Sequence, residues 1–342
     1  MARRLLPGIL ALASVSCGVE FDPPSEVKSL RVLAVQKSLP YARPGESVDV
    51  SMLWHDGSTK APRNIQVAWL TGCFNPPGDS FALCGEAFGE AGGSGGGGGL
   101  GLPPGVSVGF GDTHTFEMPA DVVSARPPPQ DPKVPRYGLA YVFFAACAGA
   151  LGPAPPGQIA FPLACFDPEG RALGPDDFVA GYSAVYAYDS IRNENPIVTG
   201  FAFAGKDVTP SCIGTACLTT PPKAVDCAAG DPCVDACADD GADGCPGITM
   251  TPRIDPASAE VDEVSKIAYG RDFTEQMWLR YYVERGSVKS DVKLINDATK
   301  GWNDDYSTEF RAPKEKGVIS IWAAAHDNRG GVEWVRIEVG IR

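Results

Sequence analysis

Six cysteines crowd the stretch CIGTACLTTPPKAVDCAAGDPCVDACADDGADGC, residues 212–245. Thiolates bind zinc, so a zinc site formed by Cys233 and Cys237 with Cys227 and Cys245 is one interpretation. Structural zinc sites favour pairs of cysteines two residues apart and often include histidine, and this stretch has neither. The alternative is a set of disulfides that staple a segment too poor in apolar residues to fold by burial alone. The sequence favours disulfides, and it does not choose among the pairings that six cysteines allow.

The same stretch carries several aspartates on a glycine-containing segment, and Asp239, Asp240 and Asp243 lie closest together. Calcium prefers oxygen ligands, so these three residues are candidate calcium ligands. Their spacing does not follow the EF-hand loop pattern, and a solvated acidic loop is the simpler interpretation. We therefore expect no resident cofactor, with calcium as the one alternative.

The start of the chain has the pattern of a secretory signal peptide. Arg3 and Arg4 precede an uncharged, mostly apolar run over residues 5–15. This run is shorter than the roughly 18–20 residues that span a bilayer. A short apolar run after basic residues is typical of a signal peptide, which we assign to residues 1–17.

The segment SVSC, which ends the signal peptide, resembles a lipobox, in which small residues precede a cysteine that becomes lipidated. It departs from that pattern because Ser14 stands where leucine is usual. Lipidation at Cys17 would anchor the protein to a membrane. The alternative is ordinary signal-peptidase cleavage near Ser14 or Ser16, which would leave a plain secreted protein.

The number of cysteines supports the lipid anchor independently. The chain has 11 cysteines, and an odd number in an exported protein leaves one unpaired. Without Cys17 the remaining ten fall into two even groups. The disulfide candidates are Cys73, Cys84, Cys147 and Cys165 in the first group, and Cys212, Cys217, Cys227, Cys233, Cys237 and Cys245 in the second. Disulfides persist in oxidising compartments, so this usage indicates an exported protein.

Residues that could support catalysis are few and scattered. His55, His114 and His326 are the only histidines, and none belongs to an HExxH motif; no GxSxG motif occurs either. His326 opens the segment HDNRGG, whose Asp, Asn and Gly are the residues that a tight turn requires. The acidic pairs at 176–177 and 304–305 have no partner that the sequence identifies. We therefore predict that the protein is not an enzyme.

The charge of the chain excludes one class of partner. The net charge is −13, and removal of the signal peptide takes away two of 29 basic residues and none of 42 acidic ones, which leaves −15. Nucleic-acid binding needs a basic patch that releases counterions from phosphates, so nucleic acid is not an expected partner.

The rest of the sequence reads as short strands and loops. Two stretches alternate between apolar and polar residues, VKSLRVLAVQ (27–36) and GESVDVSMLWHDG (45–57), and RNIQVAWLTG (63–72) is a third run rich in β-forming residues. No segment keeps a helical apolar period, so helices should be few and short. A glycine-rich stretch (85–105) and a proline-rich stretch (124–136) should be loops, and proline should keep the second one extended.

A weak internal repeat organises these strands. THTFEMP (113–119) is followed by YGLAYVFFAACAG (137–149), and STEFRAP (307–313) is followed by KGVISIWAAAHDNRGG (316–331). Each has a Phe-x-x-Pro unit, a glycine, and an apolar strand that ends in a glycine turn. Upstream, residues 27–36 match NPIVTGFAFAG (195–205), and SVDVSMLWHDG (47–57) matches QMWLRYYVERGSV (276–288) loosely.

The repeat predicts an all-β protein of two immunoglobulin-like β-sandwich domains with long loop insertions. A linker at 18–25 would lead to domain 1 at 26–192, and domain 2 at 194–342 would carry a cysteine-rich insertion at 210–246. Most tryptophans fall in or beside the expected strands, where core packing is a simpler role than ligand stacking. They are Trp54, Trp69, Trp278, Trp322 and Trp334.

The stretch LRVLAVQKSLPYARPGESVDVSMLW resembles the opening of Ig-like domains in uncharacterised bacterial lipoproteins. FRAPKEKGVISIWAAAHDNRGGVEWVRIEV (310–339) is similar to the closing strands of bacterial Ig-like, cadherin-like or PKD-like modules. These resemblances cover well under half of the chain and carry over no functional residue. They imply a non-catalytic scaffold or binding module outside the cytoplasm.

Two functional hypotheses follow. The first is a lipid-anchored protein of the bacterial cell envelope, at the outer membrane with a periplasmic or surface-exposed body, whose further partners are envelope proteins or glycans met through loops. A calcium-dependent adhesion module is a variant of it. The second is an extracytoplasmic hydrolase of envelope or extracellular polymers, with carboxylates that meet only in the folded chain.

Overall fold

The computed structural model describes residues 23–84, 106–155, 161–238 and 244–342. Cys17, the candidate calcium ligands Asp239, Asp240 and Asp243, and the glycine-rich stretch lie outside these ranges. The strands of the first half are β1 (Leu30–Lys37), β2 (Tyr41–Ala42), β3 (Ser47–Asp56), β4 (Gln66–Phe74), β5 (Ser107–Phe110), β6 (Thr113–Glu117), β7 (Gly138–Cys147), β8 (Ala150–Pro153), β9 (Leu163–Phe166) and β10 (Phe178–Ala187).

The second half is also built from strands. They are β11 (Val198–Phe203), β12 (Lys206–Val208), β13 (Cys212–Ile213), β14 (Cys233–Val234), β15 (Ile248–Ile254), β16 (Met277–Val283), β17 (Ser287–Val288), β18 (Val292–Asp297), β19 (Gly301–Trp302), β20 (Thr308–Arg311), β21 (Gly317–Asp327) and β22 (Val332–Ile341). The helices are short, as expected: α2 (Glu263–Tyr269) and the 3-10 turns η1 (Pro77–Asp79), η2 (Phe81–Leu83), η4 (Gly214–Leu218), η5 (Cys227–Ala229) and η6 (Pro256–Ser258).

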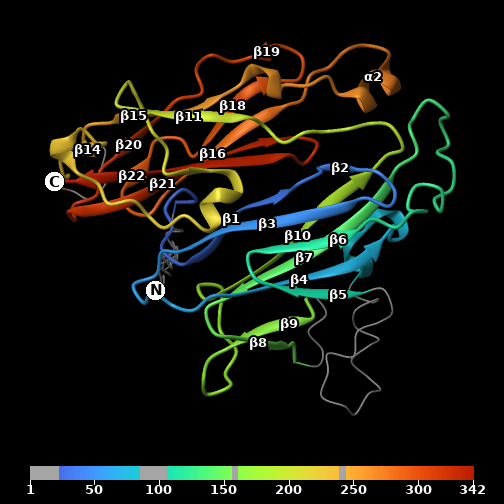
Figure 1. Ribbon diagram of the computed structural model, residues 1–342, viewed down its shortest axis with the longest axis horizontal. Coiled ribbons are helices and arrows are strands. Elements are labelled where there is room, and N and C mark those ends of the chain that lie inside the picture. The colour runs from blue at the N-terminus through green and yellow to red at the C-terminus, as the bar shows by residue number, and fades with distance from the viewer. Residues whose placement is uncertain (1–22, 85–105, 156–160, 239–243) are drawn as a thin grey trace, which may run out of the picture.

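These strands form two β-sandwiches (Figure 1). The first pairs the sheet β1-β3-β6 with the sheet β2-β10-β7-β4-β5. The second pairs β12-β11-β15-β20-β17 with β13-β22-β21-β16-β18-β19, and β14 also joins β22. In each sandwich, a set of three neighbouring strands, β1-β3-β6 or β11-β15-β20, faces the other sheet. In that other sheet a short strand pairs in parallel with a longer one, β2 with β10 and β14 with β22. This is an immunoglobulin-like arrangement, so the expectation of an all-β sandwich fold is confirmed.

Most of the matched stretches occupy equivalent places. β1 and β11 lie at one edge of a three-strand set, β6 and β20 at the other, and β7 and β21 are both central strands of the facing sheet. The loose match between residues 47–57 and 276–288 is wrong, because β3 corresponds to β15 and β16 corresponds to β4. Alternating apolar strands look alike at either place, so alternation alone does not distinguish β15 from β16.

One strand supplies two hydrophobic cores. Leu30, Val32 and Val35 of β1 pack inside the first sandwich. A bulge between Val32 and Ala34 interrupts the alternation and turns Leu33 and Ala34 to the other face. The sheet β1-β3-β6 is therefore apolar on both faces, and burial of the second face needs a further layer of protein.

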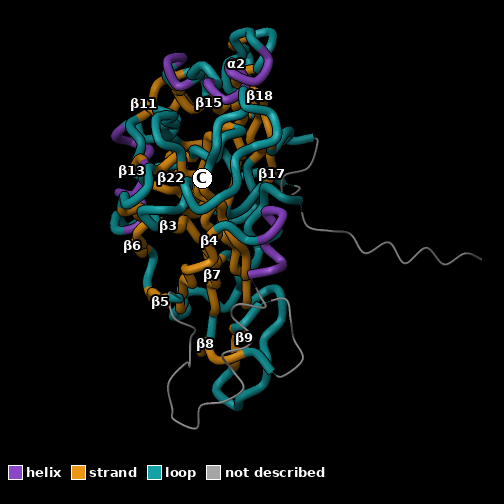
Figure 2. Tube along the Cα trace, turned by 90° about the vertical axis from the view of Figure 1, so that its right-hand side faces the viewer, coloured by secondary structure: helices purple, strands orange, loops and turns teal. Residues whose placement is uncertain are grey.

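That layer is the second sandwich. We call the buried cluster between β1-β3 and β22-β21-β16 the seam; its members are Val27, Leu33, Ala34, Leu53, Cys212, Cys217, Tyr282, Trp322, Ala324, Val332 and Trp334. Figure 2 shows the second sandwich, with β11, β15, β18 and β22, stacked over the first, with β3, β4, β6 and β7. The two sandwiches thus lie side by side as four layers of sheet, and the second doubles back along the first.

Residues 188–197 make the turn between the sandwiches, and their side chains contact both. Arg192 pairs with Glu46 of the first sandwich at 2.7 Å, and this hydrogen bond lowers the pKa of Glu46 to about 2. The Asn195 amide donates to the Lys37 carbonyl at 2.7 Å and accepts from the Val332 amide at 2.9 Å. Residues 188–197, which link the two sandwiches, are therefore fixed in place by hydrogen bonds.

The HDNRGG segment forms the expected turn, between β21 and β22, but it is buried against this linker. The Arg329 side chain is 3% exposed and pairs with Glu275 at 2.6 Å and Glu260 at 2.9 Å. Asp327 accepts the amides of Arg329 and Gly331, and a Cβ on Gly331 would lie 2.1 Å from the Asp327 carboxylate. Burial raises the pKa of Glu275 to about 8 against the opposing effect of Arg329. The turn is therefore a polar centre of the contact between sandwiches.

The ten cysteines outside residue 17 form five disulfides, each between sequence neighbours. The pairs are Cys73–Cys84, Cys147–Cys165, Cys212–Cys217, Cys227–Cys233 and Cys237–Cys245. The first two tie insertions to the ends of β4 and β7, and the other three lie in the cysteine-rich insertion. The even grouping of four and six therefore reflects one group of disulfides in each sandwich.

Candidate binding pocket

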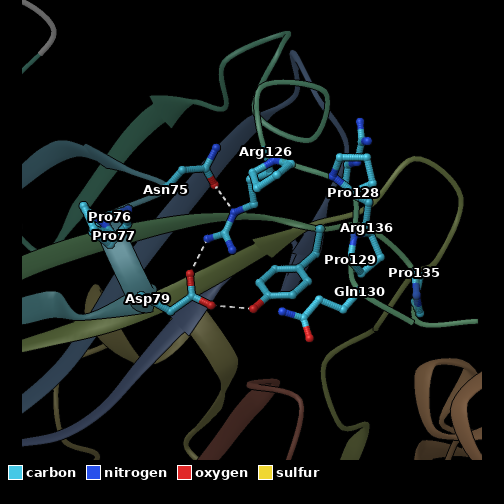
Figure 3. A pocket seen from close by; sticks show the side chains of 13 residues that line it. Asn75, Pro76, Pro77, Asp79, Arg126, Pro128, Pro129, Gln130, Pro135 and Arg136 are labelled. Atoms are coloured by element: carbon cyan, nitrogen blue, oxygen red, sulfur yellow. Dashed lines mark hydrogen bonds and ion pairs between the residues drawn. The ribbon is translucent and has the colours of Figure 1, made fainter. Parts of the chain in front are cut away.

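A pocket of ≈ 490 Å³ lies at the end of the first sandwich where β7 begins. Its lining residues are Asn75, Pro76, Pro77, Gly78, Asp79, Arg126, Pro127, Pro128, Pro129, Gln130, Pro135, Arg136 and Tyr137. Figure 3 shows Pro76 and Pro77 on one side of the pocket and Pro128, Pro129 and Pro135 on the other. Two walls of pyrrolidine rings therefore face each other across it.

Local sequence explains both walls. The first wall follows β4, and the Cys73–Cys84 disulfide closes the loop that carries it. Asn75 and Asp79 take left-handed backbone conformations, with φ of 48° and 57°, which these two residue types tolerate better than most. The second wall is the proline-rich stretch, where repeated prolines restrict φ and stiffen the chain.

Four hydrogen-bonded side chains form the floor of the pocket (Figure 3). The Arg126 Nε donates to the Asn75 amide oxygen at 2.7 Å, and its guanidinium pairs with the Asp79 carboxylate. The Tyr137 hydroxyl donates to the other oxygen of Asp79. Burial alone would raise the pKa of Asp79, but the hydrogen bonds from Arg126 and Tyr137 outweigh it and hold that pKa below its usual value. The floor is therefore neutral overall and fixed before any ligand arrives.

Aromatic rings support the floor from behind. The Arg126 guanidinium lies over the Tyr137 ring, 4.5 Å from its centroid. The same ring contacts Tyr186 and Tyr188, with centroids 5.7 Å and 6.1 Å away. Tyr188 belongs to a cluster that also includes Val264 of α2. The pocket is thus braced by both sandwiches.

The rim of the pocket carries a second arginine, Arg136, whose surroundings differ from those of Arg126. Arg136 lines the pocket and is half-buried. Among the residues that the structure describes, its side chain has no ion pair or hydrogen bond, in contrast to Arg126. One positive charge therefore stays uncompensated at the mouth of the pocket.

The lining of the pocket is mostly apolar. The thirteen lining residues include no serine, cysteine, histidine or lysine, and the single carboxylate, Asp79, already accepts from Arg126 and Tyr137. Nucleophilic or general acid–base catalysis needs such groups paired with one another and within reach of a substrate. What the pocket offers is apolar surface, a rigid polar floor and one available cation.

The expected chemical residues of the cysteine-rich stretch do not gather into a site in the described ranges. Asp226 caps η5, Asp231 pairs with Lys223 at 3.1 Å, and Asp235 pairs with Arg342 at 3.0 Å. No group of three or more His, Cys, Asp or Glu residues in those ranges is placed to hold a metal ion.

The three histidines are separate from one another. His55 contacts the Trp322 ring at 4.7 Å, and His326 stacks on Trp278 at 5.4 Å with ring planes 8° apart. His114 lies against Gly109, where an added Cβ would meet its imidazole at 2.1 Å. All three are packed side chains.

The acidic pairs also have local partners. Asp177 pairs with Arg63 and, at 3.6 Å, with Lys60. Asp305 accepts from Ser307 at 2.8 Å. These carboxylates are thus engaged in the structure of loops. Of the tryptophans expected in cores, Trp69, Trp322 and Trp334 are buried, whereas Trp54 and Trp278 are half-buried.

Sequence reasoning missed the pocket because its walls are 47 or more residues apart in the chain, as Asp79 and Arg126 are. The proline-rich stretch was the available signal, since a stiff loop with two arginines suggests a built surface. Nothing in the sequence pairs that stretch with the short segment after β4.

Comparisons with known proteins add little to this picture. No family model and no curated protein matches the chain. The fibronectin(III)-like modules of CbhA from Clostridium thermocellum are similar at 10% identity and a TM-score of 0.20, over 90% of this chain and 94% of that one. Alpha-2-macroglobulin from Escherichia coli, activated by porcine elastase, is similar at 10% identity and 0.20, over 94% of this chain and 22% of that one.

A bacterial ice-binding adhesin of 1.5 MDa is similar at 8% identity and a TM-score of 0.19, over 92% of this chain and 66% of that one. TM-scores this low support no argument about function, and the fold assignment depends on the strand pairing described above. In the described ranges, no helix is long and apolar enough to cross a membrane.

Proposed function

We propose that this protein is a non-catalytic binding protein of the bacterial cell envelope, exported and lipid-anchored through Cys17. Five disulfides suit an oxidising compartment and support export. The lipobox-like segment before Cys17 supports the anchor. The proposed partner is a component of the envelope that docks at the proline-walled pocket.

The observation that supports binding over catalysis is the state of the pocket floor. Asn75, Asp79, Arg126 and Tyr137 satisfy one another, so none of these groups is available to move a proton. A rigid, preformed cavity loses little conformational entropy when it is filled, which favours recognition.

Mass spectrometry of the mature N-terminus tests the anchor. We expect a lipid-modified cysteine at residue 17, and we expect Cys17→Ala to leave the envelope fraction and appear in the soluble one. A mature N-terminus that starts elsewhere without lipid would refute the anchor and leave the binding role to its own test.

Site-specific photo-cross-linking in the native host tests the binding role. A photoreactive residue at Gln130, on the pocket rim, should give an adduct with one envelope component. The matched control is Lys300, an exposed residue of the second sandwich. Equal or absent adducts at the two positions would contradict a partner at the pocket.

A further inference from the structure

The walls and the charge of the pocket restrict what it accepts. Its apolar surface comes mainly from proline rings on two facing sides (Figure 3). The C–H groups next to a proline nitrogen are electron-poor, and the face of an aromatic ring is electron-rich. A flat aromatic ring therefore fits between such walls better than a branched aliphatic chain does. A cavity of ≈ 490 Å³ is within the range of small-ligand pockets and has room for one aromatic side chain with part of its backbone.

The polar groups of the pocket argue against a sugar. A glycan needs donors and acceptors for its many hydroxyl groups, and each unmatched polar group costs free energy on burial. The Asp79 and Tyr137 side chains are already bonded within the floor, so the polar groups left for sugar hydroxyls are mainly the remaining N–H groups of Arg126 and the side chains of Gln130 and Arg136. These groups are nearly all donors, whereas a sugar ring also presents several donors of its own that need acceptors.

The charge points to an acidic neighbour of the aromatic ring. Arg126 is compensated by Asp79, whereas Arg136 has no ion pair in the described part of the chain. On the proline-rich stretch, Asp131 accepts the Lys133 amide, and the opposite charges of these two exposed side chains offset each other. In a chain with a net charge of −13, Arg136 is therefore the one uncompensated positive charge among the residues that line the pocket. A carboxylate next to the ring would form a charge-assisted hydrogen bond with Arg136.

We propose that the pocket binds an aromatic side chain on a polypeptide partner, with the ring between the proline walls and a flanking Asp or Glu of the partner on Arg136. This inference rests on the proposed binding role and specifies its partner class. Interfaces of this kind concentrate their affinity in one buried aromatic anchor and a few polar contacts.

Fluorescence anisotropy with labelled peptides tests the proposal on the full mature protein. The probe is Gly-Ser-Glu-Trp-Glu-Ser-Gly, with matched peptides in which Trp is replaced by Ala or both Glu by Lys. We expect saturable binding of the probe only, and at least tenfold weaker binding by Arg136→Gln. Arg136→Lys should lose less affinity than Arg136→Gln, because it keeps the charge although it lacks the planar guanidinium.

Lys133→Gln is the matched control, since it removes a positive charge from the same stretch without touching the pocket, and it should change affinity less than twofold. Circular dichroism checks that each variant keeps its fold. Failure of the acidic Trp probe to saturate, or an unchanged affinity in Arg136→Gln, would overturn the proposal. Saturable binding of an N-acetylglucosamine hexamer that blocks the cross-link from Gln130 would also overturn the proposal.

The two proposals fail separately. If the peptide probe does not bind but the Gln130 cross-link to an envelope component persists, the polypeptide class is wrong and the binding role stands. If the peptide probe does not bind and the Gln130 cross-link is also absent, the binding role is wrong as well.

Discussion

The strand sets β10-β7-β4 and β22-β21-β16 occupy equivalent positions, and both have aromatic outer faces, but the two faces are covered differently. On the first, Phe81 of η2 stacks on Tyr182 at 4.2 Å and contacts Tyr141 at 6.3 Å. That face is covered by insertions of its own sandwich, and the pocket lies at its end. On the second, Trp322 and Trp334 are covered by the first sandwich at the seam.

The difference shows how one architecture gives two outcomes. A sheet face covered by a whole sandwich becomes a continuous core, with Trp334 fully buried. A face covered by loops retains exposed rings, such as Tyr182 at 45%, and gaps between loops. The loop covering thus leaves room for the proline-walled pocket at the end of the first face, and the seam should contribute far more to stability.

Replacing one aromatic residue on each face should give the largest difference in stability between the two faces. Trp334→Ala removes a fully buried side chain and should lower the free energy of unfolding by about 3–5 kcal/mol. Tyr182→Ala should lower it by roughly 1 kcal/mol or less, because its ring is already partly exposed. Urea unfolding measures both values. Similar losses would mean that the seam is not a core.

Arg329→Met tests the polar centre of the seam. It leaves Glu275, whose side chain is 1% exposed, without its cation, which should cost about 3–5 kcal/mol. The raised pKa of Glu275 lets it take up a proton, so the loss should lie toward the lower end. Arg329→Met combined with Glu275→Leu should recover most of it. No recovery in the double variant would show that Arg329 acts mainly through its other contacts, which include Glu260 at 2.9 Å and the Tyr41 ring at 5.5 Å.

Acid should weaken the second sandwich through His326. Burial, with Arg280 and Lys37 adding to it, lowers the pKa of His326 to about 4, against about 6.5 in the unfolded chain. The unfolded chain then binds more protons, so the stability present above pH 6.5 is lost as the pH falls toward 4. The shift corresponds to roughly 3 kcal/mol. Stability measured from pH 7 to 4.5 should fall less steeply in His326→Phe, and equal slopes would rule this histidine out.

The smallest effect should come from a single hydrogen bond across the seam. The Tyr282 hydroxyl donates to the Leu33 carbonyl at 3.0 Å, and the Tyr281 hydroxyl donates to the Tyr306 carbonyl at 2.7 Å inside the second sandwich. Each Tyr→Phe change should cost about 1 kcal/mol. Hydrogen exchange should separate them, because only Tyr282→Phe should speed exchange in β1. Faster exchange there in Tyr281→Phe would mean that the two hydrogen bonds are not locally distinct.

The parts of the fold that sequence predicts are those encoded locally. Alternation, turn residues and the repeated Phe-x-x-Pro unit identify the strands and the all-β class. The loose match of residues 47–57 with 276–288 fails because alternation reports a half-buried strand and not its place in a sheet. The seam is invisible for a related reason: Leu33 and Trp322 look like ordinary strand residues whichever layer covers them.

The candidate site is harder still to predict. Asp79 and Arg126 belong to separate loops, and their ion pair depends on how both loops cross the end of β7. Disulfide pairing is a similar case, since spacing in the chain permits many partners and only the fold brings Cys147 to Cys165. Asp239, Asp240 and Asp243 keep their status as calcium candidates, with a calcium-free acidic loop as the simpler alternative.

The doubled-back chain also sets how far the protein can reach. Residues 25–27 bond to Val283 of β16, and β1 then starts beside Asp176, at the end of the first sandwich opposite Tyr137. The ten residues of β7 separate those ends by about 33 Å. The described chain that follows the proposed anchor at Cys17 would therefore start one sandwich length from the pocket. Two sandwiches in line would extend about twice as far but would bend at their junction. The packed arrangement is shorter, and it fixes the orientation of the pocket relative to the start of the described chain.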